Sequence, residues 1–173
     1  YFIEPVKEVR VKPPWLDRYP IGNQSKLLGE IVPLSEKLES HLKALEVWER
    51  DKEILWRDGK DLVMTVKRIF DKMGIKATMR EEEGRHDLEL LYEDFFGICE
   101  IKGVRGYANV GDIRQLLDHH IEALKINPSA KGIFIVNHFK SVNPPERGVG
   151  YSSDAIRLGT NNKFCLMTMW DLF

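Results

Sequence analysis

Two segments in the first half of the chain repeat their hydrophobic residues with the period of an amphipathic helix. In the first, leucines and a tryptophan recur every three or four residues from Leu34 to Leu55, and Pro33 suits the first turn of a helix. In the second, DLVMTVKRIFDKMG, the apolar residues again share one face, and Gly74 is a natural C-terminal cap. The sequence therefore predicts a long helical region from Pro33 and a second helix that ends near residue 73. Four prolines among residues 1–24 predict an extended arm before them.

From residue 75 the hydrophobic period shortens to that of β-strands. KATMR is a short strand candidate, HDLELLY alternates polar and apolar residues, and FFGICEIKG follows the acidic turn Glu93-Asp94 as the second arm of a hairpin. KGIFIV is an almost continuous apolar run, which is typical of a strand covered on both faces, and FCLMTM predicts a last strand. Between these strands the sequence predicts one helix that begins at an N-cap, Asp112, and ends before Asn127, and a short helix around residues 154–158.

The predicted order is helix, three strands, helix, strand, helix, strand. This order indicates an α/β fold in which helices flank a small mixed β-sheet. The arm and the long helical region make up residues 1–58 as an N-terminal helical extension, and the α/β core takes residues 59–173.

The composition is that of a globular protein and adds one constraint on function. The 173 residues include 26 Lys and Arg against 27 Asp and Glu, whereas proteins that mainly grip phosphate backbones are usually basic. The positive excess lies in residues 101–173, with 9 basic and 6 acidic residues. Cys99 and Cys165 both lie in apolar runs, which predicts reduced core thiols and a cytoplasmic location. No apolar run approaches the roughly 20 residues that cross a bilayer, so we expect no membrane partner.

The sharpest chemical feature is Glu100-Ile101-Lys102 in an apolar strand, with Asp87 on the neighbouring strand. Residues two apart in a strand share a face, so Glu100 and Lys102 project together. Two carboxylates that converge repel each other unless a cation lies between them, and hard oxygen ligands suit Mg²⁺ or Mn²⁺. A lysine beside that metal can orient a water, which suits hydrolysis of a phosphodiester. The alternative is an exposed acid and lysine that form only a weak, solvated ion pair.

These residues, in this order of elements, resemble the PD-(D/E)XK superfamily of restriction-endonuclease-like nucleases. The resemblance covers roughly residues 59–173 and implies a restriction-endonuclease-like core. It implies that Asp87 and Glu100 are metal ligands, that the Ile101 carbonyl is a further ligand, and that Lys102 orients the attacking water. Many members carry a glutamine in the helix after the lysine strand, and Gln115 matches that position.

The chain departs from the family pattern at three positions. His86 stands in place of the proline of the family name, and His119 replaces an aromatic residue four positions after the glutamine. Val63 stands where many members have a glutamate in the first core helix, with Asp61 the nearest acid. The metal site therefore lacks one supporting carboxylate of the family pattern.

Other polar residues are candidates for contact with nucleic acid. The glycine-containing loop GVRGYANVG offers Arg105 and Tyr107 for a phosphate contact or a stacked base, although a plain mobile loop fits the pattern equally well. Arg114, Lys140 and Arg147 are the other basic candidates that could flank a cleft. The adjacent pair His119-His120 faces two sides of a helix, which favours ordinary surface histidines over a zinc pair. We expect the His86 side chain to point away from the face that Asp87 occupies.

Three functions are compatible with these observations. The first is a metal-dependent nuclease, an endonuclease that cuts DNA in preference to RNA. The second is a non-catalytic nucleic-acid-binding or scaffolding module of the same fold, and the third is a different α/β enzyme that acts on a small phosphorylated molecule. The leucine stripe fits packing against the domain better than a strict coiled coil, because His41 and Lys52 interrupt the heptad, and its length leaves a homodimer open.

Overall fold

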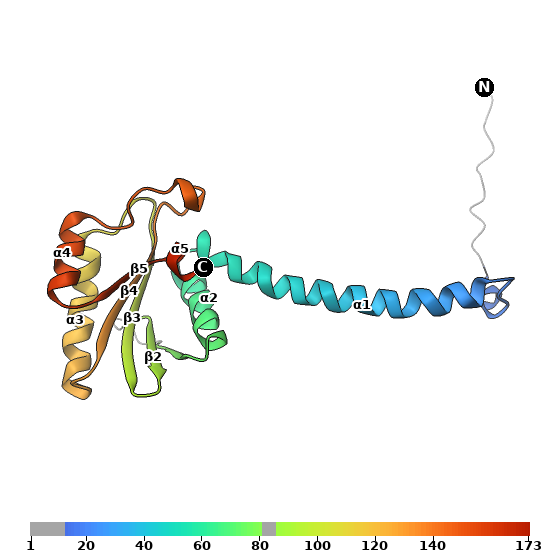
Figure 1. Ribbon diagram of the computed structural model, residues 1–173, viewed down its shortest axis with the longest axis horizontal. Coiled ribbons are helices and arrows are strands. Elements are labelled where there is room, and N and C mark those ends of the chain that lie inside the picture. The colour runs from blue at the N-terminus through green and yellow to red at the C-terminus, as the bar shows by residue number, and fades with distance from the viewer. Residues whose placement is uncertain (1–12, 81–85) are drawn as a thin grey trace, which may run out of the picture. The chain divides into compact units, whose positions relative to one another are not determined.

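The computed structural model describes residues 13–80 and 86–173, and its contacts divide the chain into two units, Tyr1–Glu46 and Val47–Phe173 (Figure 1). This division falls twelve residues before the sequence-predicted boundary after residue 58. The reason is the segment around Ile54, whose side chain is fully buried in the core of the second unit.

The first unit is helical over most of its described residues. A 3-10 helix, η1 (Pro14–Arg18), precedes α1 (Gln24–Asp51), which continues into the second unit. The prediction that the helix starts at Pro33 is wrong, because α1 begins nine residues earlier and holds Pro33 in its interior. The predicted arm is helical at η1, and its residues 1–12 lie outside the described part of the chain. No residue of α1 is buried.

The second unit contains the α/β core. The α2 helix ends where Gly74 adopts a φ of +81°, a left-handed conformation that glycine adopts without strain. The elements in chain order are η2 (Lys52–Leu55), α2 (Gly59–Lys72), β1 (Lys76–Met79), β2 (Leu88–Tyr92), β3 (Phe95–Gly103), α3 (Val110–Ile126), β4 (Lys131–Asn137), η3 (Pro144–Glu146), α4 (Ser153–Asn161), β5 (Cys165–Thr168) and α5 (Met169–Leu172). The predicted order of helices and strands is confirmed.

The five strands form one mixed sheet in the order β1-β2-β3-β4-β5. The first three strands pair antiparallel as a meander, and Leu88 lies opposite Cys99 in the β2–β3 hairpin. The β3–β4 and β4–β5 pairs are parallel, and Glu100 lies beside Phe134 of β4. Parallel neighbours need a crossover connection, which α3 and α4 provide. As a result, β3 is an inner strand that joins the antiparallel and parallel parts of the sheet.

Alternate residues of the inner strands serve two separate cores. Cys99 and Ile101 of β3 pack with Leu62 and Val66 of α2 on one face. On the other face, Ile98 packs with buried residues of α3, α4 and β4. Figure 1 shows α2 on one side of the sheet and α3 with α4 on the other. Because Ile98, Glu100 and Lys102 share a face, the two charged side chains belong to the side covered by α3.

Two local predictions differ from the structure. The N-cap of α3 is Asn109, whose side chain accepts from Gly111 N, and Asp112 is the third helical residue of a capping box. Cys99 is buried as predicted, whereas Cys165 is exposed, because β5 lies at the edge of the sheet. The helix and the strand themselves lie where the sequence pattern predicted them.

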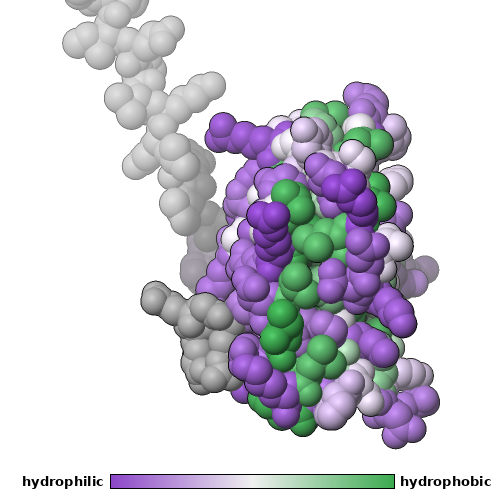
Figure 2. Space-filling model, turned by 90° about the vertical axis from the view of Figure 1, so that its left-hand side faces the viewer, coloured by the Kyte–Doolittle hydropathy of each residue, from purple (hydrophilic) through white to green (hydrophobic). Residues whose placement is uncertain are grey.

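The outer surface of α3 and α4 is mixed in polarity. Ile121 and Ile126 of α3 and Ile156 of α4 are exposed. Figure 2 shows hydrophobic residues gathered in a narrow band down this face, bordered by hydrophilic ones. Within residues 13–80 and 86–173, no helix combines the length and the apolar character needed to cross a bilayer.

Candidate active site

Asp87 lies at the start of the β2–β3 hairpin, where the strand pairing begins. Its Oδ2 atom accepts a hydrogen bond of 2.7 Å from the backbone N–H of Ile101. Asp87 directly precedes Leu88, which pairs with Cys99, and its hydrogen bond with Ile101 brings it close to Glu100, between those two residues of β3. Burial raises the pKa of the Asp87 carboxyl, and the Ile101 N–H, His119 and Lys102 oppose that shift.

Glu100 is a buried acid in the middle of an apolar strand. Only 3% of the residue is exposed, and its Oε2 atom has no hydrogen-bond partner within the described residues. Burial, and next the charge of Asp87, raise its pKa to about 8, although Lys102 favours the ionised form. A buried carboxylate that lacks a partner is costly, so its position next to a second acid indicates a site for a cation.

Lys102 lies at the end of β3 and is held by the first turn of α3. Its Nζ atom is 3.0 Å from Asp112 Oδ1, while Asp112 Oδ2 accepts from the backbone N–H of Asn109. One carboxylate thus caps the helix and fixes the lysine on the face of Glu100. The following residue, Gly103, fits closely against the N-cap residue of α2, because a Cβ atom there would lie 2.6 Å from Asp58 Cβ.

Two histidines that the sequence did not assign to the site lie near it: His119 lies beside Glu100, and His86 lies beside His119. The Nδ1 atom of His119 is 3.3 Å from Glu100 Oε2, without hydrogen-bond geometry. The His86 ring lies edge-on to His119, with the ring centroids 6.1 Å apart, and its Nε2 atom is 3.4 Å from Glu89 Oε1. The prediction that His86 faces away from this side is wrong, because the strand begins only at Leu88 and residue 86 does not follow its alternation. Burial lowers the pKa of His86.

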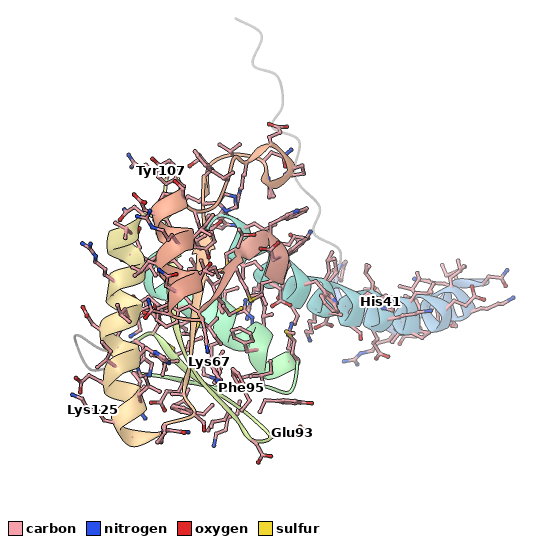
Figure 3. The ribbon with its side chains drawn as sticks, turned by 60° about the vertical axis from the view of Figure 1, so that its left-hand side comes forward. His41, Lys67, Glu93, Phe95, Tyr107 and Lys125 are labelled. Carbon is pink, nitrogen blue, oxygen red and sulfur yellow. The ribbon has the colours of Figure 1, made fainter. Side chains whose placement is uncertain are left out.

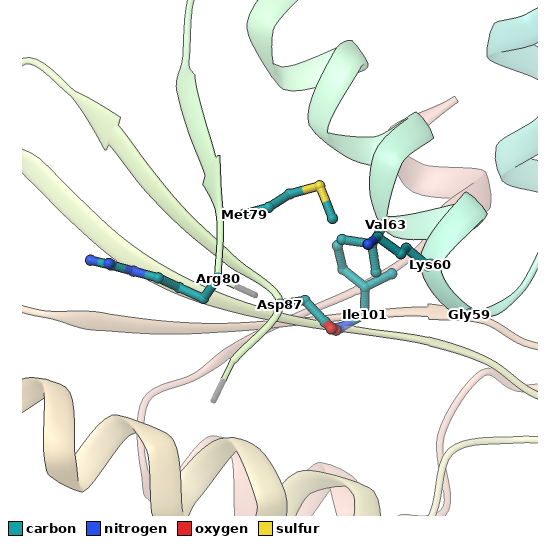
Figure 4. A pocket seen from close by; sticks show the side chains of 7 residues that line it. All are labelled: Gly59, Lys60, Val63, Met79, Arg80, Asp87 and Ile101. Carbon is teal, nitrogen blue, oxygen red and sulfur yellow. The ribbon is translucent and has the colours of Figure 1, made fainter. Parts of the chain in front are cut away.

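A pocket of about 310 Å³ opens on the α2 side of Asp87 and Ile101. Figure 4 shows Asp87 and Ile101 on its floor, with Lys60 and Val63 reaching in from the first turns of α2. Val63 occupies the position at which the family resemblance implies a glutamate, so this position offers the pocket no carboxylate oxygen. Because the N–H and C=O groups of one residue face the same neighbouring strand, the Ile101 carbonyl points to the side of Asp87.

The donor set fits a hard divalent cation with few protein ligands. Asp87 and Glu100 could supply carboxylate oxygens and Ile101 a carbonyl, and Mg²⁺ is often held by only one or two carboxylates with water and substrate phosphate. Within the described residues, no group of three or more His, Cys, Asp or Glu side chains is arranged to hold a metal ion. The fit therefore rests on the unpartnered Glu100 oxygen and the adjacent Asp87.

Gln115 lies on α3 between Asp112, which contacts Lys102, and His119, which approaches Glu100. Helical spacing puts it on the same side of the helix as Asp112, three residues before, and His119, four residues after. Its side chain is exposed, in contrast to Leu116 beside it, which is fully buried. Its assignment as a catalytic residue stays a prediction from the resemblance.

The residues predicted to bind nucleic acid are dispersed. Arg105 and Tyr107 are exposed in the loop after β3, and Tyr107 lies at the opposite end of the unit from the hairpin turn at Glu93 (Figure 3). Arg114 lines a different pocket, between α3 and α4, with Asp154 and Arg157.

Lys140 and Arg147 make internal contacts near the start of α2. Lys140 forms an ion pair with Asp58. The Arg147 guanidinium donates to Asn137 Oδ1 at 2.8 Å and to the backbone carbonyls of Leu55 and Val142. These contacts favour a structural role for both residues, which fasten the loop after β4 to the segment before α2.

The sequence predicted Asp87, Glu100 and Lys102 on the strands and Gln115 on the helix, and it did not predict the approach of Asp112 and His119 to β3. The alternation of β3 was sufficient to pair Glu100 with Lys102. The role of Asp112 as partner of Lys102 and the approach of His119 to Glu100 depend on how α3 packs across the sheet, which no local pattern encodes. The one available signal was that His119 replaces an aromatic residue of the family pattern.

Comparisons with known proteins give structural likeness at low identity. No protein-family model matches the chain, and no curated protein sequence matches it. Among solved structures, it is similar to a repair endonuclease from Pyrococcus abyssi (TM-score 0.44, 16% identity, 65% of this chain and 46% of that chain). It is also similar to the restriction endonuclease FokI bound to DNA (TM-score 0.49, 15% identity, 70% of this chain and 25% of that chain). A third similar structure is a protein of unknown function (TM-score 0.49, 10% identity, 61% of this chain and 55% of that chain).

The chain therefore spans about half or less of the length of these solved chains. The strand order, the mixed pairing and the helices on both faces confirm the predicted fold class. The second unit is an α/β core in which helices flank a small mixed sheet, and a long helical region precedes it.

Proposed function

We propose that the chain is a metal-dependent nuclease domain, an endonuclease that hydrolyses phosphodiester bonds. The observation that carries the proposal is the buried Glu100 carboxylate, unpartnered at Oε2 and close to Asp87, with Lys102 two residues further on the same face. The preference for DNA over RNA follows from the resemblance of these residues to the PD-(D/E)XK pattern.

In this proposal each side chain has a distinct task. Asp87, Glu100 and the Ile101 carbonyl would hold Mg²⁺ or Mn²⁺, which when bound would stabilise negative charge at the scissile phosphate. Lys102 orients a water whose oxygen bonds to phosphorus as the phosphorus–ester oxygen bond breaks, so that the products are a phosphate monoester and an alcohol. Asp112 keeps the Lys102 ammonium on the Glu100 side of the sheet. Gln115 would contact the substrate from the same side of α3.

A cleavage assay tests the proposal. The intact protein is incubated with supercoiled, linear and single-stranded DNA and with RNA, in Mg²⁺, in Mn²⁺ and in EDTA. We expect cleavage that requires the divalent ion and is lost in Lys102→Ala. Lys131→Ala is the matched control, because Lys131 is an exposed lysine at the start of β4. Absence of cleavage by the intact protein, or equal cleavage by Lys102→Ala, contradicts the proposal.

The second candidate function is a non-catalytic nucleic-acid-binding or scaffolding module. One observation favours it: Val63 brings an apolar side chain to the pocket at the point where a further carboxylate would complete the family pattern. Such a module would bind DNA without requiring the carboxylates. Unchanged DNA binding in Asp87→Ala, together with no cleavage by the intact protein, would identify this second function.

The remaining expectations concern the setting of the domain. A homodimer formed through the N-terminal helical region and a cytoplasmic location stay predictions from the sequence. The dimer is testable in solution and is treated with the α1 helix below.

A further inference from the structure

His119 presents a buried nitrogen to the acid at the centre of the candidate site. Its Nδ1 atom and Glu100 Oε2 lie 3.3 Å apart, and neither has a hydrogen-bond partner among the described residues. Both side chains are largely shielded, with 13% of the His119 side chain and 4% of the Glu100 side chain exposed. Two unsatisfied polar atoms this close need only a small rotation to form a hydrogen bond.

The position of His119 is determined by the packing of α3. Leu116, one turn before it, and Ala123, one turn after it, are buried against the sheet and hold this part of the helix over β3. The His86 ring also makes a T-shaped contact with the imidazole, with 6.1 Å between the two ring centroids. The imidazole is therefore confined between α3, His86 and Glu100, so it has few alternative rotamers.

We propose that His119 is a positioning residue, which holds Glu100 Oε2 through Nδ1 so that the other carboxylate oxygen is presented to the divalent ion. The inference rests on the proposed function. Polar groups that hold a metal ligand from behind fix its orientation, and their loss commonly reduces metal affinity by about 10–100-fold. Asp87 has a comparable support, since the Ile101 N–H occupies its Oδ2 atom.

The neighbouring His120 provides a control on the same helix turn. Its Nε2 atom lies 2.9 Å from the carbonyl of Ala130, and its ring packs edge-on against Phe164. It thus faces the core between α3 and β4, away from Glu100. A general effect of changing a histidine in α3 would therefore arise at either position, whereas an effect on Glu100 would arise only at His119.

The test is Mn²⁺ binding by the full chain, measured by calorimetry without nucleic acid. Two substitutions are compared: His119→Phe keeps a planar ring without a donor, and His119→Gln keeps an amide N–H that can reach Glu100. We expect His119→Phe to weaken Mn²⁺ binding by about 10–100-fold. We expect His119→Gln to recover most of that loss and His120→Gln to bind as the unsubstituted protein does. Thermal unfolding of each variant in EDTA verifies that it is folded.

The outcomes separate this inference from the proposed function. If the unsubstituted protein binds Mn²⁺ and His119→Phe, folded, binds it equally well, the positioning role is wrong and the nuclease proposal stands. If His119→Gln is as weak as His119→Phe while His120→Gln is unaffected, a donor at this position does not restore Mn²⁺ binding and the proposed hydrogen bond is wrong. If the unsubstituted protein binds no Mn²⁺, the proposed metal site fails first and this inference with it.

Discussion

Ionisation of Glu100 is unfavourable in the folded protein, and a cation bound next to its carboxylate would offset that cost. Its carboxyl has a pKa of about 8 in the folded chain, against 4.5 for an ordinary glutamate, because it is buried and faces Asp87. The folded protein therefore binds a proton that the unfolded chain has released between pH 4.5 and about 8. Stability accordingly falls as the pH rises through this window and levels off above it.

We predict that Glu100→Gln stabilises the protein in EDTA at pH 8, because the amide need not ionise. From the size of the pKa difference the gain is on the order of 3–5 kcal/mol. It should shrink toward zero at pH 4.5, where the glutamate is protonated in both states. Urea denaturation at pH values from 4.5 to 9 measures it, with Glu122→Gln, an exposed acid of α3, as the control. An equal stability of both proteins at pH 8 would show that Glu100 has an ordinary pKa.

At the scale of single elements, α3 carries more of the site than the sequence indicated. Its capping box and its contact with Lys102 share one residue, Asp112, because each carboxylate oxygen serves one of them. Asn109, by contrast, caps the helix and is not paired with Lys102. The two residues therefore separate the stability of the helix from the placement of the lysine.

We predict that Asp112→Ala and Asn109→Ala each lower the free energy of unfolding by about 1 kcal/mol through loss of a cap. Only Asp112→Ala should also reduce the rate of DNA cleavage, because it releases the Lys102 ammonium. Chemical denaturation and cleavage kinetics of the two variants provide the comparison. Equal cleavage rates in both would mean that the ion pair has no part in the reaction.

The elements that the sequence predicted well are those whose burial follows one local period. The α2 helix and the β2 strand belong to this class, because their buried apolar residues face one core at regular spacing. The start of α1 differs from the prediction because Pro33 lies inside the helix, and an exposed helix can contain a proline when water satisfies the free carbonyl. The partners of Lys102 and Glu100 come from a different element, α3, and tertiary packing alone brings them together.

At the scale of the whole molecule, the five residues predicted to bind nucleic acid, all of which the structure describes, do not gather around the site. Of the five residues predicted to bind nucleic acid, Lys140 and Arg147 are paired within the fold and Arg114 lies beside α4. The overall charge of −1 is consistent with few phosphate contacts.

We therefore predict weak DNA binding. The logarithm of the association constant should fall with the logarithm of the salt concentration at a slope of roughly −2. Fluorescence anisotropy in EDTA from 50 to 300 mM salt measures it, and a slope steeper than about −5 would reveal a basic surface that the described residues do not form.

The α1 helix leaves a stripe of large apolar side chains exposed to solvent. The stripe consists of residues that are each 48–65% exposed and recur at three- and four-residue steps: Leu27, Leu28, Ile31, Leu34, Leu38, Leu42 and Leu45. Apolar surface of this extent on one helix is typical of a face that another helix covers. A second copy of the chain supplies an identical face, which is the homodimer predicted from the sequence.

We predict a concentration-dependent mass that approaches twice the 20.1 kDa of one chain in analytical ultracentrifugation. Leu38→Glu combined with Leu45→Glu should shift the protein to the monomer, because burying two carboxylates in a helix interface is strongly unfavourable. Ser40→Glu, on the opposite side of the same helix, is the control and should leave the mass unchanged. Because these positions lie outside Val47–Phe173, the thermal unfolding of the core should not change in the double variant. A protein that is monomeric at every concentration before substitution would rule out self-association through α1, and a nuclease reaction would then have to be completed by a single copy.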